Sequence, residues 1–141
     1  MAVYTSNSRE ETAALGRRLG QVLAPGTLVA FTGGLGAGKT AFCEGLAAGL
    51  GCIDPVSSPT FAIVNYYRGP RPLAHFDLYR IHTEEDLCAA GFYDYLDAGA
   101  VLAAEWSENL PGVLAAEHPV RVDIQILGDT SRKITVTGVE L

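Results

Sequence analysis

The sequence predicts a single α/β domain in which helices flank a mixed, mostly parallel central sheet, with an antiparallel hairpin at the C-terminus. An apolar, β-prone run at residues 27–31 leads through a glycine-rich loop into an apolar helix pattern at 38–50. A second apolar run, at residues 100–104, stops abruptly at an acidic residue, as expected of a buried parallel strand. Residues 120–137 alternate apolar and polar side chains on both sides of a turn, which predicts the hairpin. The order of the strands does not follow from the sequence.

The length and composition of the chain fit one globular domain, residues 1–141. Apolar residues make up 48% of the chain and charged residues 18%, which is too apolar for a disordered chain. The net charge of −6 and the pI of about 4.9 argue against independent, tight binding of nucleic acid. No apolar run is long enough to span a membrane, and Arg9 and Glu10 precede any hydrophobic stretch of a signal peptide. We therefore expect a soluble, cytoplasmic protein.

The three cysteines are widely spaced and form no C-x-x-C pattern. This spacing excludes a disulfide framework and a zinc site. Cys43 and Cys88 lie in apolar helix patterns and are expected to be small buried residues.

The N-terminal part is predicted to hold one long helix, residues 9–23. Residues 1–7 are expected to be a short extended lead-in, and the S-x-x-E pattern at 8–11 is a capping box for the helix. Arg17 and Arg18 lie off the apolar stripe and are expected to face solvent. The predicted stripe consists of Leu15, Leu19 and Val22. This helix and the one at 38–50 are expected to cover the sheet.

The middle of the chain predicts a loop, a hairpin and a short helix. Residues 51–60 contain two prolines and are predicted to be a loop. The stretches 61–68 and 73–80 are rich in β-formers and flank a Gly-Pro turn, which predicts an antiparallel hairpin. Thr83 and the acidic residues after it cap a helix that ends at Gly91.

Two further segments carry weaker patterns. Residues 92–96 are expected to form another helical turn. Residues 107–119 contain two prolines and a glycine, so we expect a connection with at most one turn of helix.

The glycine-rich loop at residues 33–40, GGLGAGKT, fits the phosphate-binding pattern G-x-x-x-x-G-K-[ST] at every fixed position. Glycines permit the tight turn and the close backbone approach with which N–H groups surround an anion. Lys39 would supply a charge to the β and γ phosphates, Thr40 a hydroxyl to Mg²⁺, and the next helix its positive N-terminal end. The alternative is a glycine-rich turn that binds nothing, but the strand–loop–helix context favours a P-loop NTPase-like domain.

Two acidic residues are candidates for the metal and for catalysis. Glu105 follows the buried strand at 100–104, and ligands of open α/β sheets bind outside such strand ends. Asp77 lies in an apolar strand between Phe76 and Leu78, where a half-buried carboxylate needs a partner and could orient a water or contact Mg²⁺. The alternatives are a surface glutamate and a structural pair of Asp77 with a neighbouring Arg or His. The sequence does not decide which carboxylate touches the metal.

Four further side chains have structural explanations beside the functional ones. Thr60 lies in a loop of the kind that senses a γ-phosphate, although an ordinary turn threonine explains it equally well. His75 and His82 do not have metal-ligand spacing and are expected to be structural. Trp106, the one tryptophan, is expected either in the core or beside the nucleotide.

Four segments in this order resemble the TsaE family, small bacterial ATPases required for making threonylcarbamoyl-adenosine in tRNA. They are GLGAGKT at 34–40, SPTF at 58–61, HFDLYR at 75–80 and EW at 105–106. The phosphate loop alone is generic, and the combination of the Asp-Leu-Tyr-Arg segment with Glu-Trp makes the resemblance specific. It extends over nearly the whole chain.

The resemblance implies ATP and Mg²⁺ as cofactors. It implies that Thr40 and Glu105 hold Mg²⁺ and that Asp77 and Lys39 act in hydrolysis. The residues that it places at ATP are Gly36, Ala37, Gly38, Lys39, Thr40, Ala41, Thr60, Trp106 and Arg132.

The resemblance also implies two sugar-kinase-like partner proteins that carry out the threonylcarbamoyl transfer. The ATPase would be slow alone and would reset or activate their complex, with tRNA contacted only indirectly. One alternative is a P-loop small-molecule kinase, but residues 81–97, the candidate lid, contain no Arg or Lys to stabilise phosphoryl transfer. Another is a GTP-responsive switch, but the N-K-x-D segment that reads guanine is absent.

Overall fold

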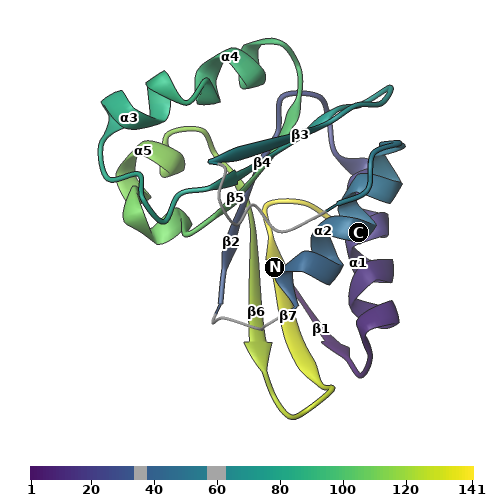
Figure 1. Cartoon of the computed structure of the whole chain (residues 1–141). Helices are drawn as coiled ribbons and strands as arrows, with labels where there is room; N and C mark the ends of the chain where they lie inside the picture. The colour runs from purple at the N-terminus through teal and green to yellow at the C-terminus, as the bar shows by residue number, and fades with distance from the viewer. Residues whose placement is uncertain (34–37, 57–62) are drawn as a thin grey trace.

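The computed structural model describes residues 1–33, 38–56 and 63–141 of the chain. Within these stretches seven strands form one sheet in the order β1-β7-β6-β2-β5-β4-β3 (Figure 1). The strands are β1 (Ala2–Ser6), β2 (Leu28–Thr32), β3 (Val64–Tyr67), β4 (Leu73–Asp77), β5 (Val101–Glu105), β6 (Val120–Ile126) and β7 (Arg132–Thr137). The helices are α1 (Arg9–Val22), α2 (Lys39–Leu50), α3 (Glu84–Ala89), α4 (Phe92–Asp97), the 3₁₀ turn η1 (Ser107–Asn109) and α5 (Pro111–Ala115).

The sheet is mixed, as predicted, with its parallel pairings in the centre. β2 pairs in parallel with β5 on one side and with β6 on the other, and β4 pairs in parallel with β5. The antiparallel pairings are the outer ones, of β3 with β4, β6 with β7, and β7 with β1. Both predicted antiparallel hairpins are confirmed. Each hairpin contributes one strand, β4 or β6, that runs parallel to the centre.

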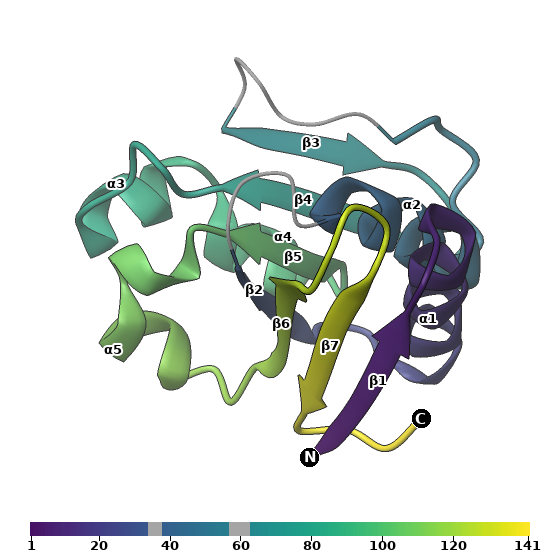
Figure 2. The ribbon, with the colours of Figure 1, turned by 90° about the horizontal axis from the view of Figure 1, so that it is seen from below.

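Two layers of helices cover the sheet. α1 and α2 pack on one face, over a core that includes Leu19, Phe42 and Leu46. Helices α3, α4 and α5 lie on the other face, over a core that includes Phe76 and Phe92 (Figure 2). Both faces of the central strands are therefore buried, which explains why the sequences of β2 and β5 are continuously apolar.

The contact between α1 and α2 depends on four small residues. They are Gly16 and Gly20 on α1 and Gly45 and Gly49 on α2. A Cβ atom on Gly45 would overlap the carbonyl oxygen of Ala13, and one on Gly16 would overlap that of Phe42. The two backbones therefore approach closely, and a larger side chain at either glycine would force the helices apart.

This packing corrects the predicted stripe of α1. Leu15 and Leu19 are buried as predicted, but Val22 is 50% exposed. The buried stripe continues through Gly16 and Gly20 instead, because the glycines face α2.

The N-terminal cap of α1 forms in a modified way. The Ser8 hydroxyl accepts a hydrogen bond from the Glu11 backbone N–H at 3.1 Å, as a capping box requires. The Glu11 carboxylate, however, accepts from the backbone N–H of Asn7 at 2.7 Å, one residue before the position that the motif predicts.

The C-terminal ends of α1 and α2 are joined by Arg71, from the turn between β3 and β4. Its guanidinium donates to the carbonyl oxygen of Gly49 at 2.7 Å and to that of Leu23 at 3.4 Å. Carbonyl groups at helix ends lack intrahelical partners, so one side chain satisfies groups from both helices. Arg71 thereby fixes the helix pair to the β3–β4 hairpin.

Several expectations about the remaining segments need correction. Residues 1–7 do not form a mere lead-in, because β1 completes one edge of the sheet against β7. Residues 107–119 form both η1 and α5, which is more helix than predicted. Cys43 is buried as predicted, but Cys88 is exposed.

The short helices agree with the prediction. Thr83 caps α3 by accepting from the Asp86 backbone N–H, and Gly91 follows its C-cap with a φ of +87°. In the three described stretches, no helix is both long enough and apolar enough to cross a membrane.

The glycine contact predicts that Gly45→Ala destabilises the protein. The added methyl group meets the α1 backbone, so we expect the free energy of unfolding to fall by about 1–3 kcal/mol. Urea denaturation followed by circular dichroism measures this change. The matched control is Gly112→Ala in α5, where a Cβ meets nothing within 4 Å. Equal midpoints for the two variants would contradict the close packing.

Candidate functional site

The candidate site lies where the parallel strands β2, β4 and β5 end and α2 begins. β2 ends at Thr32, and α2 begins at Lys39 after Gly38, which has a φ of +97°. The strand and the helix predicted on either side of the loop are therefore present. Gly36 and Ala37, expected at the phosphates, and Thr60 lie outside the described residues.

Gly33, the first residue of the motif, is required by its surroundings. Its φ is +129°, and a Cβ atom there would overlap the carbonyl oxygen of Ile124 on β6. Only glycine permits both this conformation and this contact. The backbone at Gly33 therefore lies tightly against β6.

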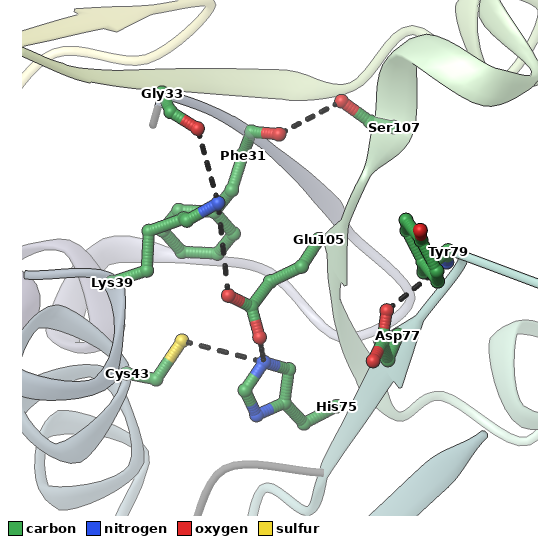
Figure 3. A network of polar contacts seen from close by, with 9 residues as sticks. All are labelled: Phe31, Gly33, Lys39, Cys43, His75, Asp77, Tyr79, Glu105 and Ser107. Carbon is green, nitrogen blue, oxygen red and sulfur yellow. Dashed lines mark hydrogen bonds and ion pairs between the residues drawn. The ribbon is translucent and has the colours of Figure 1, made fainter. Parts of the chain in front are cut away.

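Lys39 extends across the start of the loop (Figure 3). Its ammonium nitrogen donates to the carbonyl oxygen of Gly33 at 3.2 Å and lies 3.9 Å from Oε1 of Glu105. It also lies 5.8 Å from the ring centre of Trp106, within the range of a cation–π contact. The lysine side chain is only 10% exposed, so its charge is held close to these groups.

Glu105, the last residue of β5, is held from two sides. Its Oε1 faces Lys39, and its Oε2 lies 2.8 Å from Nε2 of His75 (Figure 3). Burial would raise the pKa of this carboxyl, but the hydrogen bond and charge of His75 and the charge of Lys39 keep that pKa below its ordinary value. Glu105 is therefore a carboxylate at neutral pH, as a metal ligand must be.

Sequence reasoning gave His75 no place at the site, but the structure puts it in contact with Glu105. The histidine side chain is 1% exposed, and Sγ of Cys43 lies 3.9 Å from the same nitrogen that binds Glu105. Burial would lower the pKa of His75, but Cys43 and the Glu105 carboxylate together raise it well above 6.5. The signal was the strand alternation, which places His75 on the same face of β4 as Asp77.

Asp77 lies beside Glu105, because the two residues are direct partners in the parallel pairing of β4 with β5. Its Oδ1 accepts a hydrogen bond from the backbone N–H of Tyr79 at 3.0 Å. Among the described residues, neither Arg80 nor His75 forms the structural pair with Asp77 that was the alternative explanation. The two candidate carboxylates thus end adjacent strands.

Trp106 begins the turn after β5 in an unusual conformation. Its φ is +59°, which is rare for a residue with a large side chain, and such residues gather at functional sites. Its ring makes an edge contact with Tyr79 at 4.9 Å between centres. The partly buried Trp106 therefore borders the candidate site next to Lys39.

Two side chains of η1, which the sequence did not reveal, hold this turn in place. Ser107 donates to the carbonyl oxygen of Phe31 on β2 at 2.9 Å. Asn109 donates to the carbonyl oxygens of Leu78 and Tyr79, at 2.7 and 3.2 Å. The segments after β4 and β5 are thereby joined to β2.

A pocket of about 260 Å³ opens beside the first residues of α2. Among its lining residues are Gly38, Ala41 and Arg132, all predicted at the nucleotide, together with Arg9 and Asp129. The Arg132 guanidinium donates to the carbonyl oxygens of two residues of the β6–β7 turn, both at 2.9 Å. The structure thus brings Arg132 to the start of α2 from the other end of the chain.

The donor set fits magnesium bound together with a phosphate group. In the part of the chain that the structure describes, no three His, Cys, Asp or Glu side chains gather as an all-protein metal site. Mg²⁺ usually takes one or two carboxylates and completes its shell with water and substrate phosphates. Glu105, with Thr40 in the first turn of α2, supplies such a partial set.

The contact between His75 and Glu105 predicts a pH-dependent stability difference between the wild type and His75→Gln, since glutamine keeps a donor but carries no charge. A raised histidine pKa stabilises the folded state fully below the unfolded value of about 6.5, and this stabilisation is lost as the pH rises through the folded pKa. The stabilisation is also lost as the pH falls below about 4.5, because Glu105 becomes protonated. Urea midpoints measured from about pH 3 to about pH 9 test both changes.

The exposed His82 provides the control, as His82→Gln. A difference between the wild type and His75→Gln that stays constant over this range would show that His75 carries no stabilising charge.

Comparison with known proteins shows the family of the chain. The family model of "Threonylcarbamoyl adenosine biosynthesis protein TsaE" matches residues 6–134. The chain is 37% identical over 131 residues to a tRNA threonylcarbamoyladenosine biosynthesis protein TsaE of Treponema pallidum, covering 93% of this chain and 96% of the relative. It is 39% identical over 132 residues to the TsaE protein of Bacillus subtilis, covering 92% and 81%.

A solved structure agrees with this assignment. The crystal structure of YdiB from Bacillus subtilis superimposes with a TM-score of 0.74 and 30% sequence identity, covering 99% of this chain and 86% of that one. The likeness therefore extends over the whole sheet and its helices. The chain belongs to the TsaE family of threonylcarbamoyl adenosine biosynthesis proteins.

Proposed function

We propose that this protein is a Mg²⁺-dependent ATPase that acts as a nucleotide switch in the synthesis of threonylcarbamoyladenosine in tRNA. The observation that carries the proposal is the Glu105 carboxylate, held ionised at the end of β5 beside Lys39 and the start of α2. Membership of the TsaE family supports the role in threonylcarbamoyladenosine synthesis. The geometry of the site supports the binding and hydrolysis of ATP.

Lys39 and the N-terminus of α2 would hold the phosphates. The Lys39 ammonium is bonded to the backbone of Gly33, an oxygen acceptor that a β- or γ-phosphate oxygen can replace. The N-terminus of α2 adds the positive end of a helix dipole and backbone N–H groups. Both features attract the same anionic group.

Thr40 and Glu105 would hold the magnesium ion. When bound, Mg²⁺ neutralises charge on the β- and γ-phosphate oxygens. Glu105 approaches from the end of β5, and Thr40 lies in the first turn of α2. Lys39 already bridges these two elements through its contact with Glu105.

Asp77 would orient the attacking water. Its carboxylate ends the strand next to Glu105, and the Tyr79 backbone N–H fixes one of its oxygens. The remaining oxygen can accept a hydrogen bond from a water molecule, which is the role of a water-positioning carboxylate in phosphoryl transfer. Two carboxylates on adjacent strands thus divide the tasks of metal binding and water orientation.

The pocket lined by Arg132 would take the base end of ATP. It adjoins Gly38 and Ala41, so a nucleotide with its phosphates at α2 can reach it. Arg9 and Arg132 provide planar cations there, which stack on and hydrogen-bond to purines.

The expected partners are two sugar-kinase-like proteins that carry out the threonylcarbamoyl transfer. With a net charge of −6, this chain is unsuited to holding tRNA itself, so the partners would bind the tRNA in the cytoplasm. Turnover would be slow for the isolated chain and coupled to the complex. A small-molecule kinase is the competing assignment, and transfer of phosphate to a metabolite instead of to water would favour it.

Fluorescence of Trp106 tests the nucleotide site, because this single tryptophan borders Lys39. We expect ATP with Mg²⁺ to change the emission, and Lys39→Ala to weaken binding roughly 10–100-fold through the loss of charge-assisted hydrogen bonds. Asp77→Asn should retain binding and lose hydrolysis. Lys133→Ala removes the other lysine of the chain and is the matched control.

ATP binding is measured both for the isolated chain and in the presence of the partner complex. Absence of ATP binding in both conditions would contradict the proposal. A preference for GTP over ATP in competition would replace it with a guanine-nucleotide switch.

A further inference from the structure

His75 is buried behind Glu105, which it contacts, and does not itself line the proposed site. Its side chain is 1% exposed, and it makes a 2.8 Å hydrogen bond to the Glu105 carboxylate (Figure 3). Burying an ionisable ring costs free energy unless the ring is hydrogen-bonded, and the bond to Glu105 offsets that cost. The geometry of the contact shows what it does for Glu105.

The register of β4 and β5 directs the imidazole to Glu105. His75 is the direct partner of Ala103, and Asp77 is the partner of Glu105. Side chains at i and i+2 share a face, so His75 and Glu105 are diagonal neighbours on the face that α2 covers. The residue opposite His75, Ala103, has a small side chain.

The two oxygens of Glu105 have different partners. Oε2 accepts from His75, and Oε1 faces the Lys39 ammonium at 3.9 Å. A glutamate side chain has several rotamers, and ordering it costs conformational entropy. The hydrogen bond from His75 fixes the carboxylate with Oε1 toward Lys39.

Cys43 contacts the His75 ring from the α2 side, but this contact does not make Cys43 a catalytic nucleophile. Its sulfur and the Glu105 carboxylate both lie at Nε2, at 3.9 and 2.8 Å. A cysteine–histidine–acid relay needs the thiol and the acid at opposite ring nitrogens. Nδ1 has no hydrogen-bond partner among the described residues. The cluster therefore orients Glu105 and is not a second catalytic centre.

We propose that His75 is a positioning residue for Glu105, which sets the metal affinity of the site without touching the metal. The inference rests on the proposed function, because it concerns the Mg²⁺ carboxylate of that site. Removal of a hydrogen-bond donor behind a metal ligand commonly lowers metal affinity 10–100-fold. The loss of metal affinity should depend on whether the new side chain has a donor that reaches Glu105, and not on the volume of that side chain.

Three substitutions separate these possibilities. His75→Gln places an amide donor near the position of Nε2, His75→Asn keeps the amide but is one methylene too short, and His75→Leu keeps volume without a donor. Binding of Mn²⁺ in the presence of ADP, followed by electron paramagnetic resonance, reports the metal directly. Emission of Trp106 with ADP in excess chelator reports metal-free nucleotide binding. His82→Asn, at an exposed histidine, is the control.

We expect His75→Asn and His75→Leu to bind Mn²⁺ roughly 10–100-fold more weakly than the wild type, and His75→Gln within about threefold. Binding of ADP without metal should be unchanged in all three. If His75→Leu does not fold, the comparison of Gln with Asn decides alone.

Wild-type Mn²⁺ affinity in His75→Asn would overturn the inference, and so would an equal loss in His75→Gln, because the donor would then not matter. A wild-type protein that binds neither ADP nor Mn²⁺ would overturn the proposed function itself. Normal binding by the wild type and by His75→Asn would overturn the inference alone.

Discussion

The candidate site depends on one partly buried carboxylate, which lies between the ammonium of Lys39 and the imidazole of His75. Glu105 would be unfavourable at the end of an apolar strand if it stood alone, since burial raises the free energy of its charged form. Lys39 and His75 offset that cost from opposite sides. The carboxylate therefore remains charged and oriented where the strands end and α2 begins, and every proposed role of the site is built around it.

The position of α2 must be as well defined as that of β5 for this arrangement to hold. α2 carries Lys39 at its start and Cys43 one turn later, so a small shift of the helix would separate the ammonium from Glu105 and uncover His75. The glycines in its contact with α1 allow a backbone approach that fixes the separation, because interiors resist small displacements. Arg71 fixes the far end of the same helix. Residues remote from the site thus determine its geometry.

Those parts of the structure that depend on local pattern could be predicted from the sequence. The phosphate-loop context, the buried strand before Glu105 and the C-terminal hairpin each follow from a short run of residues. What could not be predicted depends on pairing between distant segments. The role of His75 requires the register of β4 against β5, and β1 becomes a strand only because β7 lies beside it. Likewise, Val22 has an apolar side chain, but the glycines decide which face of α1 is buried.

The charge distribution explains why the proposed role is a switch and not a fast enzyme. Rapid phosphoryl transfer requires several cations around the transferred group, whereas Lys39 here is already paired with Glu105. Helices α3 and α4 lie on the other face of the sheet from α2 and contain acidic residues and no Arg or Lys. Positive charge that stabilises the transition state would then have to come from outside this chain. A site that binds nucleotide well and hydrolyses it slowly until a partner completes it couples hydrolysis to assembly, which a switch requires.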